Sequence, residues 1–351
     1  MEQTSKIATI SPSGTTQKYT RTDKMGGELT NEAPMTKTQS STCPLCRGTG
    51  RHDFTGRDLM FGGDTTYEYH QCTSCGAVYQ TPMPSSEQIA DFYPDNYAVY
   101  DENIKLKSRG ALERAMLNVS YGYEHLQAPT VLKLLAALLA PFRDRNSLPY
   151  EHGGRMLDIG CANGRFMLRM QQLGWQVQGV EFNQTAVNIC RDNNLEVFHG
   201  ELEDAGLAES TFDLITARHV IEHVPDPDAF IADITRLLKP GGRMHLRTPS
   251  SEALGRSIFG ELWYANDAPR HLFLFSKKNL NMLAAKHGLE PVTLRTNVRP
   301  KLVLNSLDYK NRNAGKPSRR SKLRRLLAKL YVPLAKPGGR GDELFAVYRK
   351  P

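Results

Sequence analysis

The chain has 351 residues, of which 40% are hydrophobic, and a formal net charge of +8. This length suits about two domains of ordinary size, and the apolar content is enough for a buried core, which excludes a wholly disordered chain. No apolar run reaches the roughly 18 residues of a membrane-spanning helix.

The N-terminal residues 1–41 are rich in Ser, Thr, Lys and Gly. They lack the apolar region of a secretory signal peptide and have the composition of a segment that cannot bury a core. We therefore expect residues 1–41 to form a disordered tail, and we expect the protein to be cytoplasmic.

Two Cys-x-x-Cys motifs follow the tail. They supply Cys43 and Cys46, then Cys72 and Cys75, with 25 residues between the motifs. Two thiolates from each turn complete a tetrahedral Zn²⁺ shell, and a shell of four protein ligands is structural rather than catalytic. Disulfides or a redox pair are the alternative, which a cytoplasmic location disfavours. Residues 42–82 are thus predicted to form a zinc ribbon with each motif at the tip of a hairpin.

Residues 83–150 are predicted to form a mostly helical connector. A capped helix is expected over 85–93 and a second helix over about 130–142. Three tyrosines follow the first helix: Tyr93, Tyr97 and Tyr100.

Strands alternate with helices over residues 151–351, which is typical of a parallel sheet that helices cover on both faces. A basic helical insertion is expected at about 300–340. The predicted strands are 155–159, 176–181, 195–199, 212–217, 242–248, 291–298 and 343–349.

The first of these strands runs into a turn of small residues, Gly160, Ala162 and Gly164, and then into a helix. Small residues let the backbone approach a ligand closely, and the helix start offers free N–H groups, so the segment predicts a nucleotide cradle. The spacing differs from the Gly-x-Gly-x-x-Gly of dinucleotide-binding folds. Asp158 ends the strand, and Glu181 ends the next strand, where a carboxylate can bind both hydroxyls of a ribose.

Later segments distinguish the candidate ligands. They are Gly200–Asp204, Thr211–Thr216, His219–Pro227 and Leu237–Arg243. In this order, the motifs resemble those of class I S-adenosylmethionine (SAM)-dependent methyltransferases, over about residues 154–298 and the terminal strand. The resemblance implies an α/β fold with a Rossmann-like, seven-stranded methyltransferase sheet, to which the small N-terminal zinc ribbon is added.

The resemblance also implies roles for the cradle residues. The turn would line the methionine portion of SAM, Glu181 would hold the ribose, and Phe182 would lie against the adenine. Ala162 departs from the family's commonest glycine, although alanine is frequent there. The complete set of predicted cofactor-binding residues is Asp158, Gly160, Ala162, Gly164, Glu181, Phe182, Glu201, Leu202, Ala217 and His219.

Two further groups complete this predicted pocket. Glu201 and Leu202 would border the amino edge of the adenine, although the family usually has Asp at the position of Glu201. Ala217, Arg218 and His219 would close the floor at the end of the fourth strand.

The layout of the whole chain narrows the resemblance. Zinc knuckles, a short helix with tyrosines and a methyltransferase core resemble bacterial methyltransferases of sugar and cell-surface polysaccharide synthesis, and the segments 268–276 and 339–344 also fit that group. This implies O-methylation of a sugar or glycan hydroxyl. C-methylation of a nucleotide-linked keto-sugar is an alternative. Modification of nucleic acid through the ribbon is another, which the four acidic residues in loop 51–71 disfavour. The intact cradle argues against a pseudoenzyme.

Two histidines are candidate catalytic residues. His223 ends a His-x-x-Glu-His sequence that matches inverted zinc proteases, but Pro225 to Pro227 prevent the long helix that such a site needs. His223 is either a packed residue that shapes the pocket or a general base near the acceptor. His271 lies among apolar residues, and it is either structural or orients the acceptor; the resemblance places its segment at the active site.

The basic charge is concentrated in one segment. Residues 300–340 contain twelve Lys and Arg and one acidic residue. The stretch 318–331 predicts an amphipathic helix. Its apolar face comprises Leu323, Leu326, Leu327, Leu330 and Tyr331. One interpretation is a surface helix docked on the last strand pair. The other is contact with an anionic membrane or a phosphate-bearing substrate.

Overall fold

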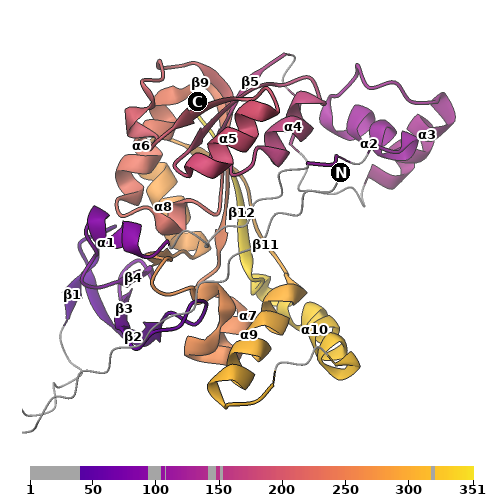
Figure 1. Cartoon of the computed structure of the whole chain (residues 1–351). Coiled ribbons are helices and arrows are strands. Elements are labelled where there is room, and N and C mark those ends of the chain that lie inside the picture. The colour runs from indigo at the N-terminus through magenta and orange to yellow at the C-terminus, as the bar shows by residue number, and fades with distance from the viewer. Residues whose placement is uncertain (1–39, 94–103, 107, 141–147, 151–152, 318–320) are drawn as a thin grey trace, which may run out of the picture. The chain divides into compact units, whose positions relative to one another are not determined.

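The computed structural model describes residues 40–93, 104–106, 108–140, 148–150, 153–317 and 321–351 (Figure 1). The predictions for most of the N-terminal tail, for Tyr97 and Tyr100, and for residues 318–320 lie outside the described residues. All described residues belong to one compact unit, Thr38–Pro351.

The N-terminal residues form a small antiparallel sheet. Its strands are β1 (Ser41–Thr42), β2 (Thr49–Arg57), β3 (Thr66–Cys72), β4 (Val78–Gln80) and β10 (Phe273–Leu274), in that order across the sheet. The first Cys pair lies between β1 and β2 and the second between β3 and β4, so each pair is at the tip of a hairpin, as predicted. The last strand, β10, comes from the distant C-terminal half of the chain.

A seven-stranded sheet forms the main domain, in the order β11-β12-β9-β8-β5-β6-β7. Its strands are β5 (Arg155–Ile159), β6 (Gln176–Glu181), β7 (Glu196–His199), β8 (Phe212–Arg218), β9 (Leu238–Pro249), β11 (Glu290–Asn297) and β12 (Glu343–Arg349). All seven predicted strands are present, with boundaries close to those expected.

The sheet is mixed rather than wholly parallel, because β12 runs antiparallel to both of its neighbours, β9 and β11. Between β11 and β12 the chain forms α9 (Pro300–Asn313) and α10 (Lys322–Ala335), which pack on each other. Two antiparallel neighbouring strands can be joined at one end of the sheet, so no helix has to cross the face of the sheet between them. The two inserted helices can therefore pack away from the sheet.

The remaining helices flank the sheet or belong to the connector and the loops. They are α1 (Ser86–Asp91), α2 (Ala111–Tyr121), α3 (Thr130–Leu139), α4 (Arg165–Gln171), α5 (Gln184–Asp192), α6 (Pro227–Leu237), α7 (Leu254–Phe259) and α8 (Lys277–Lys286). The capped helix expected over 85–93 is present as α1, and its cap is a capping box, since Ser85 and Gln88 exchange side-chain and backbone hydrogen bonds. Among the residues that the structure describes, no helix has the length and apolar character needed to span a bilayer.

The core follows the alternation of side chains along the central strands. Leu157 and Ile215 pack in one cluster with Ile231 of α6, whereas Met156 and Leu214 pack in a separate cluster. Successive residues of a strand face opposite sides, so both faces of the sheet are covered by apolar side chains. Strand β5 pairs with β6 on one side and with β8 on the other, and the chain crosses from β7 back to β8, so the order of strands reverses beside β5. Ligands of open α/β sheets bind at the carboxyl ends of strands around such a point.

Candidate functional site

The turn after β5 has the backbone that the sequence predicted for a cradle. Gly160, Ala162 and Gly164 have φ angles of +64°, +50° and +75°, in the left-handed region that favours glycine. A Cβ added to Gly160 would lie 2.6 Å from Cγ2 of Val220. The close packing beside Gly160 therefore leaves no room for a larger residue at this point of the turn.

Glu181 fixes this turn from the end of β6. Its carboxylate is buried, with 4% of the residue exposed. It accepts hydrogen bonds from the backbone N–H of Ala162 at 2.8 Å and of Asn183 at 3.0 Å. Burial raises the pKa of Glu181, and these two N–H groups act in the opposite direction. Each carboxylate oxygen keeps a second lone pair, which suits the two hydroxyls of a ribose.

Next to this carboxylate, Phe182 is 51% exposed. Its ring lies 5.7 Å from that of Tyr93 in an edge-on arrangement. An exposed aromatic face beside an anchored carboxylate fits an adenosine, whose flat base is attached to a ribose with two adjacent hydroxyls. Of the two residues predicted to border the base, Leu202 is 7% exposed and Glu201 is exposed to solvent.

Two predicted cofactor-binding residues are fully buried, namely Asp158 and Ala217. The carboxylate of Asp158 accepts hydrogen bonds from Thr216 Oγ1 at 2.5 Å and from Arg218 Nη2 at 3.2 Å. Burial raises the pKa of Asp158, while Arg218 and Thr216 lower it. Asp158 thus ties β5 to β8 beneath the cradle.

His219 follows β8 and has a φ of +60°. Its two ring nitrogens lie 3.1 Å from Glu222 and 3.0 Å from Glu343. Burial opposes protonation, but the two carboxylates outweigh it and raise the pKa of His219 to about 9. His219 is therefore a cation at neutral pH, held between two acids at the end of β8.

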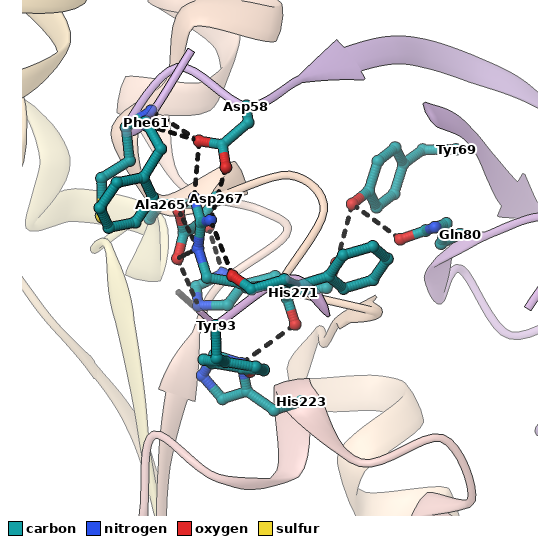
Figure 2. A network of polar contacts seen from close by, with 12 residues as sticks. Asp58, Phe61, Tyr69, Gln80, Tyr93, His223, Ala265, Asp267 and His271 are labelled. Carbon is teal, nitrogen blue, oxygen red and sulfur yellow. Dashed lines mark hydrogen bonds and ion pairs between the residues drawn. The ribbon is translucent and has the colours of Figure 1, made fainter. Parts of the chain in front are cut away.

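The structure brings the two candidate catalytic histidines together (Figure 2). The rings of His223 and His271 are 4.7 Å apart and inclined at 72°. Nδ1 of His223 lies 3.0 Å from the carbonyl oxygen of Arg270 and 2.9 Å from the hydroxyl of Tyr93. Burial lowers the pKa of His223 to about 4, so this imidazole is neutral at pH 7.

The loop that carries His271 is held by the small N-terminal sheet. Arg270 is buried and forms ion pairs with Asp58 at 2.7 Å and with Asp267 at 2.8 Å. The hydroxyl of Tyr69 donates to the carbonyl of His271 at 3.0 Å, and β4 pairs with β10 immediately after this loop. The contacts made by Asp58 and Tyr69 join residues some 200 positions apart, and nothing in the sequence indicated them.

The four predicted zinc ligands also converge. Sγ of Cys43 is 3.7 Å from that of Cys75, and Sγ of Cys46 is 3.4 Å from that of Cys72. Tetrahedral Zn–S bonds of about 2.3 Å place sulfur atoms roughly 3.8 Å apart. The four thiols thus have the spacing that a metal ion requires. Cys161 and Cys190, by contrast, are simply buried, as predicted.

The basic helix α10 does not pack on the last strand pair, although one interpretation of the sequence expected this. It packs mainly on α7 and α9, through Ala328, Tyr331 and Ala335, rather than on the last strand pair. The leucines of the expected apolar face are 47–63% exposed, whereas Tyr331 is 4% exposed. The small residues and the tyrosine are therefore its packed face, and the leucines face outward beside Arg and Lys.

Comparisons with known proteins agree with this geometry. Residues 123–294 match a family model described as a methyltransferase domain. The ubiquinone biosynthesis O-methyltransferase of Xanthomonas oryzae pv. oryzae is 36% identical over 129 residues, which are 34% of this chain and 53% of that protein. The mitochondrial protein of the same name from Schizosaccharomyces pombe is 33% identical over 143 residues, 38% of this chain and 50% of that protein.

The chain spans about half the length of these curated relatives. A SAM-dependent methyltransferase from Archaeoglobus fulgidus with a solved structure is 16% identical, with a TM-score of 0.43, and the match covers 62% of this chain and 94% of that one.

Residues 123–294 therefore match a methyltransferase domain, and the predicted Rossmann-like α/β fold with its seven-stranded sheet is confirmed. The two relatives named above carry names from ubiquinone biosynthesis, and these names give no support to the predicted link with polysaccharide synthesis.

Proposed function

We propose that this protein transfers the methyl group of SAM to a hydroxyl oxygen of its acceptor. The proposal is carried by Tyr93, which contacts both halves of the site. Its ring lies against Phe182 on the cofactor side, and its hydroxyl is 2.9 Å from His223 on the other side. A methyl donor in the cradle thus has the paired histidines as its neighbours.

Bound SAM supplies an electrophilic methyl group on a sulfonium. The chain itself binds and aligns the reactants: Glu181 takes the ribose hydroxyls, Phe182 stacks on the base and the turn admits the methionine portion. On the opposite side, the imidazoles of His223 and His271 offer ring nitrogens to an acceptor hydroxyl. Alignment supplies most of the acceleration of such a transfer, and proton acceptance matters only as the hydroxyl reacts.

The names of the relatives favour a phenolic or quinol-type hydroxyl over the sugar hydroxyl predicted from the sequence. Both acceptor classes are hydroxyls, so the same site geometry serves either. Carbon methylation is the remaining alternative, in which the histidines would act on an acidic C–H instead.

We further propose that the four cysteines hold a structural zinc ion. Their sulfur spacing and the hairpin position of each pair support this. Removal of that ion by a chelator is expected to loosen the loop of His271. The second cysteine pair lies in the hairpin of β3 and β4, and β4 pairs directly with β10, which follows this loop.

The test incubates the purified protein with SAM labelled in its methyl group and two acceptor panels, one of catechols and quinols and one of nucleotide sugars and glycans. Mass spectrometry should find acceptors heavier by one CH₂, and the chemical shift of the labelled methyl group should report attachment to oxygen. Label on carbon would replace oxygen by carbon as the acceptor atom. Tight SAM binding without any labelled product in either panel would contradict the proposal for these acceptors.

A further inference from the structure

Three side chains of types that bind metals meet on the acceptor side of the site. Glu222 and His223 lie in a short helical turn after β8, and His271 lies in the loop before β10. One ligand atom from each lies within 4.8 Å of the other two. Segments that are far apart in the sequence thus place two imidazoles and a carboxylate at one point.

The hydrogen bonds of the two histidines define their tautomers. Nδ1 of His223 lies 3.0 Å from the carbonyl oxygen of Arg270, and Nδ1 of His271 lies 2.9 Å from that of Ala265 (Figure 2). A carbonyl oxygen only accepts, so each Nδ1 carries a hydrogen, and Nε2 is the ring nitrogen that can present a lone pair.

Neither Nε2 has a hydrogen-bond donor among the described residues. The charged group beside Nε2 of His271 is a carboxylate oxygen of Asp267, 3.9 Å away, which is beyond hydrogen-bond distance and also an acceptor. The Nε2 lone pair of each ring is therefore available to a ligand, as it is for histidines in metal sites.

Glu222 adds a third acceptor. It has no exposed surface, and its Oε1 is 3.1 Å from His219. Its Oε2 is buried without a hydrogen-bond partner in the described part of the chain. A buried oxygen left without a donor costs about 1–3 kcal/mol. Since one ligand atom of Glu222 lies within 4.8 Å of one from each histidine, a positive centre between the three side chains would compensate this carboxylate.

We propose that Glu222, His223 and His271 bind one divalent transition-metal ion. Two imidazoles and one carboxylate are a ligand set of Zn²⁺, Mn²⁺ and Fe²⁺ sites with open coordination positions. Bonds of about 2.1 Å place ligand atoms roughly 3 Å apart, so small side-chain rotations close the site. The backbone carbonyls on both Nδ1 atoms hold the rings in the required orientation.

This site differs from the protease pattern in the sequence. The first histidine of that pattern, His219, is engaged on both nitrogens by Glu222 and Glu343. The second imidazole comes instead from His271, which sequence spacing alone does not connect with the pattern.

The consequence for chemistry rests on the proposed function. An ion here has coordination positions left for an oxygen of the acceptor, and it makes that hydroxyl more acidic. The acceptors favoured are then those with two adjacent oxygens, such as catechols and vicinal diols, because they chelate.

The test uses the full chain with its cysteine site loaded with zinc. Mn²⁺ is added and its free signal is followed by electron paramagnetic resonance, because Mn²⁺ prefers oxygen and nitrogen over thiolates and leaves the cysteines alone. We expect one Mn²⁺ to bind per chain. His223→Asn and His271→Asn should weaken binding at least about 10-fold, since Asn retains a donor in place of Nδ1–H but has no Nε2 lone pair.

The matched control is His287→Ala, at the residue that follows α8, which should bind Mn²⁺ as the unmodified protein does. Melting temperature and SAM affinity are measured for every variant, so that loss of the fold is distinguished from loss of a ligand. Absence of Mn²⁺ binding by the unmodified protein, or unchanged binding by both Asn variants, would overturn the metal site.

The two proposals fail separately. If the protein binds no Mn²⁺ but still transfers the methyl group at an undiminished rate, the metal site is disproved and the proposed methyltransferase function stands. Stoichiometric Mn²⁺ binding that the Asn variants abolish upholds the ion even where neither acceptor panel is methylated.

Discussion

The proposed cofactor half and the proposed acceptor half of the site are built in different ways. The cofactor half comes from one strand, one turn and the end of the next strand, and Glu181 bonds directly to the turn at Ala162. The acceptor half is assembled from the N-terminal sheet, the connector, the turn after β8 and the loop of His271. Local sequence is thus enough to build the first half, whereas the second exists only when distant segments meet.

Replacement of Arg270 is the strongest test of this difference. Arg270→Met should lower the free energy of unfolding by about 3–5 kcal/mol, because it leaves two partly buried carboxylates, those of Asp58 and Asp267, without their cation. Urea unfolding measures the change, and calorimetry on the folded variant should find SAM affinity close to normal. Arg191→Met, on the surface of α5, is the control; equal destabilisation by both would show that the joint between the sheets is not critical.

The complementary change removes the anchor of the cofactor half. Glu181→Gln should weaken SAM binding by about 10- to 100-fold, since bonds to a charged group contribute about 1.5–3 kcal/mol. Isothermal calorimetry gives the dissociation constant, and Glu209→Gln at an exposed position serves as the control. Mn²⁺ binding should stay unchanged. A loss of Mn²⁺ binding in this variant would mean that the halves are not independent.

A pH effect is expected where the insertion joins the acceptor half. Burial raises the pKa of Asp342 from its ordinary 3.8 to about 6, while Tyr331 and the N–H of Arg299 act against this. Because the folded state favours the protonated acid, this contribution to stability is complete below about pH 4 and is lost as pH rises through 6.

Asp342→Asn should remove this dependence. Between pH 4 and pH 7 the unmodified protein should lose on the order of 2 kcal/mol from this group, and the variant should not. Urea unfolding at a series of pH values measures both, and parallel profiles for the two proteins would refute the assignment.

The smallest effect is expected at α10, which supports the acceptor half through Tyr331 and the N–H of Gly255. We propose that its exposed leucines, with Lys329 and Arg325 beside them, contact anionic lipid. Lys329→Glu should weaken binding to phosphatidylglycerol vesicles by at least about 1 kcal/mol, as expected for one basic residue at a membrane surface. Flotation measures it, with Arg191→Glu as the control. Equal recovery of unmodified protein with anionic and with neutral vesicles would exclude the lipid contact.

Much of the architecture was predictable because it follows from short-range patterns. The strands of the main sheet, the left-handed turn and the hairpin position of the cysteines all depend on residues close together in the chain. The antiparallel direction of β12 was not predictable in this way, since the insertion before it hides how the chain returns. The exposed leucines of α10 were missed because a helical stripe indicates a face but not which face is packed.

The sequence by itself determined the methyl-donor cradle and the four-cysteine site, because each is made by residues whose spacing along the chain fixes their geometry. Only the tertiary structure decided the acceptor side. It placed His271 against His223 and tied Arg270 to Asp58, and it left an oxygen of Glu222 without a donor among the residues that the structure describes. These contacts depend on how distant segments, such as the small N-terminal sheet and the loop of His271, pack together. Packing of this kind leaves no periodic pattern or motif in the sequence.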